Sequence, residues 1–115
     1  MPNEDNGEKR RADNQHASIM ILSHRIGILP IPVGPQFVEH LGTADIREAM
    51  IRLRADMPPD LANSTFLHEC VHIISDLLTL ELTEQQVDGI AIGIHSIIKD
   101  NPRLIAAMLP DQDRS

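Results

Sequence analysis

Two histidines four residues apart, with a glutamate next to the first, lie inside the part of this sequence that most strongly favours a helix. The segment reads His68-Glu69-Cys70-Val71-His72. Apolar residues recur around it at helical spacing, namely Phe66, Leu67, Val71, Ile74, Leu77 and Leu78. This periodicity predicts a helix with an apolar face that ends near Leu80. We expect its N-terminus at 63–65, where Asn, Ser and Thr side chains offer N-cap oxygens.

The spacing of these two histidines suits a metal ion. Residues four apart share one face of a helix, about 6 Å apart, so His68 and His72 can bind the same ion while Glu69 lies beside it. Zinc lowers the pKa of its bound water to roughly 7, and a neighbouring carboxylate can accept a proton from that water as it attacks a carbonyl group. We therefore predict a Zn2+ cofactor with His68 and His72 as ligands and Glu69 as the catalytic base.

A second helix is predicted to begin at Thr83. The Thr83 hydroxyl can cap it, and Gln86 occupies the capping-box position. Apolar residues then follow at helical spacing until Asn101 and Pro102, which end the helix. A last short helical turn is expected within 103–109.

The third zinc ligand is expected from this second helix. A short connection places two helices antiparallel, which brings the start of the second near the end of the first. Glu84 is our candidate ligand, and Asp88, one turn further along the same face, is the alternative. Asp76 lies four residues after His72 and could orient an imidazole. Exposed helix charge is the competing interpretation for both aspartates.

The residues at 65–102 resemble the small zinc metallopeptidase domains of the ImmA/IrrE-like, gluzincin-type group found in bacteria, phages and mobile elements. In that group HExxH is followed, on a second helix, by a Glu in an ExxA[ND] pattern. The matching positions here are 84–88, with Val87 where the family often has Ala. The resemblance implies a zincin-like domain with His68, His72 and Glu84 as zinc ligands and Glu69 as general base. Asp88 would then be a supporting residue.

The part of the chain before these helices predicts strands. Residues 18–33 are apolar and β-branched but interrupted by Gly and Pro, which is typical of broken or edge strands. A short strand is expected at 35–41, and 51–55 alternates Ile, Leu and Ala with Arg, as in a strand buried on one face. Residues 1–16 are polar and predicted to be disordered. We expect one α+β domain at 17–115, in which a small antiparallel sheet precedes two zinc-binding helices.

Charge and composition exclude several classes of function. The 115 residues carry a net charge of −7, and 9–11 is the single basic run, so no nucleic-acid partner is expected. No apolar run approaches the roughly 20 residues of a membrane span, so no membrane partner is expected. Cys70 is the single cysteine, which agrees with a reducing, cytoplasmic location.

Other reactive side chains have weaker claims to a role. The chain has no Tyr to stabilise an oxyanion. His95 lies about 16 Å along the helix from Glu84, which favours an exposed or hydrogen-bonded His without a role in catalysis. His16, His24 and His40 belong to no motif. Cys70 is expected to be a small packed side chain, since no separate base for a reactive thiol is evident.

The sequence therefore predicts a zinc metallopeptidase that acts on a peptide or protein substrate. Two alternatives stay open. The chain could be a non-catalytic interaction module stabilised by zinc, which its small size and missing Tyr favour. It could also be a helical adaptor without metal, if the motif is accidental.

Overall fold

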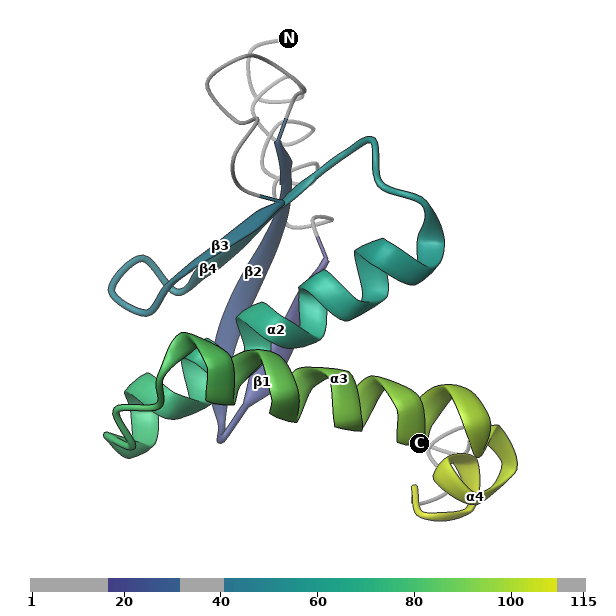
Figure 1. The fold of residues 1–115 in the computed structure, drawn as a ribbon. Helices are drawn as coiled ribbons and strands as arrows, with labels where there is room; N and C mark the ends of the chain where they lie inside the picture. Colours follow the sequence, from purple (N-terminus) through teal and green to yellow (C-terminus); the bar gives the residue numbers. More distant parts are fainter. Residues whose placement is uncertain (1–16, 32–40, 110–115) are drawn as a thin grey trace, which may run out of the picture.

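A computed structural model describes residues 17–31 and 41–109, which form the α+β structure predicted from the sequence (Figure 1). A four-stranded sheet packs against the long helix α2, and helix α3 runs along α2 on the side away from the sheet. The short helix α4 follows at the far end of α3. The tail at 1–16 and most of the strand predicted at 35–41 lie outside the described residues.

The sheet is mixed rather than antiparallel throughout, which corrects the prediction. Its strands are β1 (Ser18–Ile21), β2 (His24–Ile31), β3 (Gly42–Asp45) and β4 (Met50–Arg54), in the spatial order β1-β2-β4-β3. The pairs β1–β2 and β3–β4 are antiparallel, but β2 and β4 are parallel, with Ile28 opposite Ile51. Chain direction reverses twice between β2 and β4, and the residue pattern of a short strand does not specify the direction of its neighbour.

Helix α2 (Pro59–Leu78) begins before the predicted N-cap at 63–65. Pro58 is extended and precedes Pro59 in the first turn, and the Ala62 N–H already donates to the Pro58 carbonyl at 2.8 Å. Proline is well tolerated here because the first N–H groups of a helix have no intrahelical acceptor. Pro58 and Pro59, which follow the last strand by a few residues, therefore start the helix. The predicted end near Leu80 is close to the observed end at Leu78.

Helix α2 is buried on two sides. Toward the sheet, its Cys70 and Ile73 join a core of buried strand residues, which are Ile21, Ile26 and Ile51. Toward α3, its Val71 packs with Val87 and Ala91. The helix is thus the middle of three layers. Polar side chains of α2 can face a cleft on the part of its surface that neither the sheet nor α3 covers.

The connection from α2 to α3 is fixed by local hydrogen bonds. Thr79 adopts the left-handed conformation (φ 54°), and its N–H and that of Leu80 donate to carbonyls in the last turn of α2. This is the Schellman arrangement that ends many helices. The buried Ser75 hydroxyl then accepts from the Leu82 N–H at 3.2 Å, which holds the connection against α2.

The predicted second helix is confirmed as α3 (Glu84–Asp100), followed by α4 (Pro102–Ala107). Thr83 accepts a hydrogen bond from the Gln86 backbone at 3.1 Å, and the Gln86 side chain accepts from the Thr83 backbone at 2.9 Å. This is the predicted capping box. In the part of the chain that the structure describes, no helix combines the length and apolarity needed to cross a membrane.

We expect Ser75→Ala to lower the free energy of unfolding by about 1–3 kcal/mol, because the partly buried Leu82 N–H loses its acceptor. Urea unfolding followed by circular dichroism measures this. Ser96→Ala is the matched control, since the Ser96 hydroxyl bonds only the exposed Asp100 carboxylate and its removal should change stability by less than about 0.5 kcal/mol. Equal stabilities for the two variants would show that Ser75 does not hold the connection.

Candidate metal centre

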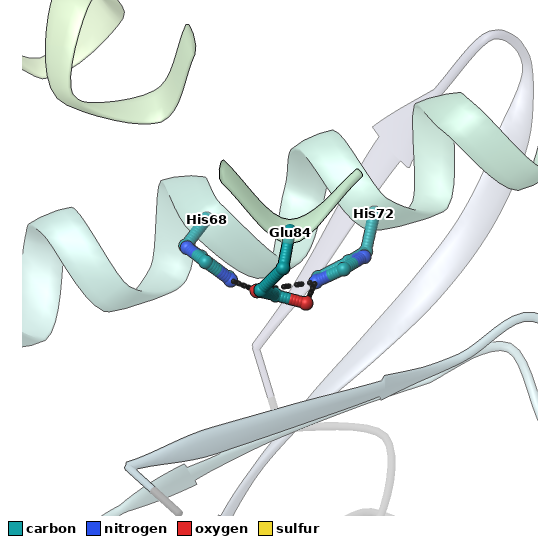
Figure 2. Close-up of side chains that lie close together, drawn as sticks. All are labelled: His68, His72 and Glu84. Atoms are coloured by element: carbon teal, nitrogen blue, oxygen red, sulfur yellow. Dashed lines mark hydrogen bonds and ion pairs between the residues drawn. The ribbon is translucent and has the colours of Figure 1, made fainter. Parts of the chain in front are cut away.

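Three side chains from α2 and α3 meet where α3 begins (Figure 2). His68 and His72 come from adjacent turns of α2, and Glu84 is the first residue of α3. The Glu84 carboxylate lies 2.5 Å from Nε2 of His68 and 3.2 Å from Nε2 of His72. The structure thus brings together the three residues that the sequence singled out as ligands.

Local structure explains how each of these side chains is positioned. The four-residue spacing puts both imidazoles on one face of α2, with ring centroids 4.9 Å apart. The Thr83 cap fixes the first turn of α3, so the Glu84 side chain starts from a defined backbone position opposite the two rings. Neither arrangement needs a contact from the sheet.

The donor set fits a metal ion. Each residue offers one ligand atom, and all three atoms lie within 4.8 Å of one another. Donors bound about 2.0–2.2 Å from a common ion are separated by distances of this order. Partial burial raises the pKa of the Glu84 carboxyl group, but its hydrogen bonds with His68 and His72 outweigh this and lower the pKa below its ordinary value. The carboxylate is therefore ionised at neutral pH, as a ligand must be.

Asp88, the alternative third ligand, contacts the other side of His68. Its Oδ1 lies 3.4 Å from Nδ1 of His68, whereas Glu84 faces Nε2. A carboxylate at Nδ1 fixes the tautomer and orientation of an imidazole that uses Nε2 as ligand. The geometry therefore favours Glu84 as the third ligand and Asp88 as the residue that orients the His68 ring. Asp76 is exposed and does not line the cleft described below.

A cleft of about 590 Å³ opens at these residues, between α2, α3 and the start of β3. The described residues that line it are Leu41, Gly42, Leu61, Ser64, Thr65, His68, Glu69, His72, Glu84, Asp88, Ala91 and Ile92. Glu69 is among them although only 6% of its surface is exposed. The predicted base therefore borders the same space as the three candidate ligands.

Sequence reasoning missed the walls of this cleft. Leu61 lies seven residues before His68, and helical periodicity would have placed it on the His68 face had α2 been predicted to start at Pro59. No local sequence pattern indicated that the start of β3 would line the cleft. At Gly42 an added Cβ would lie 3.0 Å from the Thr65 side chain and from the Arg52 carbonyl, so only glycine lets the strand approach α2 this closely.

The remaining sequence candidates lie away from the cleft. His95 is not among the cleft-lining residues, so it is not positioned to contact a substrate at the cluster. His24 is exposed on β2, and His16 and His40 lie outside the described residues. Cys70 is buried in the core against the sheet, as predicted.

Comparison of the chain with protein-family models, with curated proteins and with solved structures found no match in any of the three. Function must therefore be inferred from the site itself.

We expect the purified protein to bind about one divalent transition-metal ion per chain, and elemental analysis measures this. His68→Ala, His72→Ala and Glu84→Ala should each abolish stoichiometric binding, because each removes a donor from the cluster. Asp88→Ala should weaken affinity about 10–100-fold without removing the site. His24→Ala is the matched control and should bind as the parent does. Full occupancy in the His68, His72 and Glu84 variants would contradict the assignment.

Burial raises the pKa of the Cys70 thiol to about 11, with the neighbouring Glu69 charge adding to the effect. At pH 8 the thiolate fraction is then about a hundredfold below that of an ordinary thiol with a pKa of 9.0. We expect the folded protein to resist iodoacetamide and the urea-unfolded protein to react at the normal rate. Mass spectrometry of timed samples measures both rates, and rapid labelling of the folded protein would show that Cys70 is accessible.

Proposed function

We propose that this protein is a zinc-dependent metallopeptidase that hydrolyses peptide bonds with a zinc-activated water, as in the ImmA/IrrE-like group that its HExxH segment resembles. One observation carries the proposal. His68, His72 and Glu84 converge in a cleft that Glu69 also lines. Two imidazoles, one carboxylate ligand and a second carboxylate beside them form the donor set and base that such hydrolysis needs.

In this proposal His68, His72 and Glu84 hold the zinc ion, and Asp88 keeps the His68 ring in its ligating orientation. Nitrogen ligands with one carboxylate suit zinc better than magnesium or calcium, which prefer oxygen ligands alone. When bound, zinc polarises the substrate carbonyl group and lowers the pKa of its water to roughly 7.

Glu69 acts on protons in this proposal. It follows His68 directly, lines the cleft and is shielded from bulk solvent. Its carboxylate accepts a proton from the attacking water, and the same proton then passes to the amine nitrogen that leaves when the peptide bond breaks.

The surroundings of the site support a peptide rather than a nucleic acid as substrate. The net charge of −7 would repel phosphate groups, and the described residues that line the cleft include no Lys or Arg to bind them. The single cysteine suits a reducing compartment such as the cytoplasm.

A non-catalytic zinc-stabilised interaction module is the second candidate function. It is favoured by the chemistry of the cleft lining, because the described lining residues include no Tyr, Lys or Arg to stabilise an oxyanion. Both functions require the metal, so they differ in turnover alone.

Glu69→Gln separates the two. The amide cannot accept the proton, so we expect peptide hydrolysis to fall by at least about a hundredfold while zinc content stays at the parent level. Cleavage of internally quenched peptides and elemental analysis of the same samples measure the two quantities. Glu81→Gln, in the exposed connection after α2, is the matched control and should leave both unchanged. A zinc-loaded parent that cleaves nothing, or a Glu69→Gln variant that cleaves like the parent, would contradict the peptidase proposal.

A further inference from the structure

The cleft extends beyond the candidate ligands along the groove between α2 and α3. Leu61 precedes His68 by two turns of α2, and Ile92 follows Glu84 by about two turns of α3. Because the helices are antiparallel and side by side (Figure 1), both residues lie on the same side of the cluster. The Lys99 ammonium group, 2.8 Å from the Asp60 carboxylate, joins the two helices at that far end.

The distance along this groove is set by helix geometry. A rise of 1.5 Å per residue puts Leu61 about 10 Å along α2 from His68, and Ile92 about 12 Å along α3 from Glu84. An extended peptide advances about 3.3 Å per residue. A chain held at the cluster therefore reaches these side chains roughly three residues away.

The far end of the cleft is apolar, unlike the cluster end. Leu61 and Ile92 are 39% and 58% exposed, and the buried Ala91 lies between the α3 positions of Asp88 and Ile92. Leu41 adds a further exposed apolar side chain from the strand side. Among the described lining residues the charged groups are carboxylates, with no Lys or Arg. A ligand carboxylate would find no counter-charge among these lining residues, and the nearby Lys99 ammonium group is already paired with Asp60. An apolar group, in contrast, would bury surface on both sides.

We propose that Leu61 and Ile92 form a distal subsite that binds a large apolar side chain of the substrate, about three residues from the bond that is cut. The subsite discriminates against acidic side chains at that position. This inference rests on the proposed function, because it takes the cluster as the point at which the peptide is held. It adds a determinant of substrate choice that is separate from the metal ligands and the base.

Linear acyl hydroxamates test the subsite without turnover. The hydroxamate group chelates zinc, and the acyl chain projects from it by a length that can be chosen. We would titrate the zinc-loaded protein with acetohydroxamate and octanohydroxamate by isothermal calorimetry. Octanohydroxamate should bind at least tenfold more tightly, since each buried methylene strengthens binding about fourfold. An analogue of similar length that ends in a carboxylate should lose this gain.

Variants on two sides of α3 give the matched comparison. Ile92→Asp should reduce octanohydroxamate affinity at least tenfold and leave acetohydroxamate affinity unchanged. Ile90→Asp makes the same exchange at an exposed isoleucine of α3 that does not line the cleft, and it should change neither affinity. Unchanged acetohydroxamate binding shows that the metal site of each variant is intact.

The outcomes distinguish this inference from the function on which it rests. Failure of the parent to take up zinc or to bind acetohydroxamate would overturn the proposed function and the subsite with it. Equal affinities for the short and long hydroxamates, or equal effects of Ile92→Asp and Ile90→Asp, would overturn the subsite alone.

Discussion

The site depends on the reversal of the chain between α2 and α3. His68 and His72 face the same way because they are one helical turn apart, and this needs no tertiary structure. Glu84 reaches them only because the left-handed Thr79 ends α2 and the buried Ser75 hydroxyl holds the following connection against it. The third donor is therefore placed by short-range interactions, which explains how a small chain can build a three-residue cluster.

The same locality made most of the cluster predictable from sequence. The capping box at Thr83 and Gln86 is a pattern of neighbouring residues, and it fixed the start of α3 correctly. With that start and a short connection known, Glu84 followed from the antiparallel packing of consecutive helices. Spacing alone could not decide whether Glu84 or Asp88 is the third ligand. That depended on which ring nitrogen of His68 each carboxylate approaches.

Features that depend on distant parts of the chain were predicted poorly. The parallel pairing of β2 with β4 depends on the path of the chain between them. The cleft wall at Gly42 exists because a strand approaches Thr65 from elsewhere in the fold. Both features depend on contacts between distant parts of the chain and have no local sequence pattern, so the cleft could not be predicted together with the cluster.

The packing of α3 against α2 combines a favourable apolar contact with unfavourable repulsion between carboxylates, and metal binding would affect this repulsion. The buried contact between α2 and α3 is small, with Val71, Val87 and Ala91 at its centre. Glu84 and Asp88, one turn apart on α3, place two carboxylates at the cleft in a chain that already carries a net charge of −7. A cation bound at the cluster would offset this repulsion and would join the two helices through their side chains. Because binding to the folded state alone shifts the folding equilibrium by mass action, a metal at this cluster would stabilise the packing that forms it.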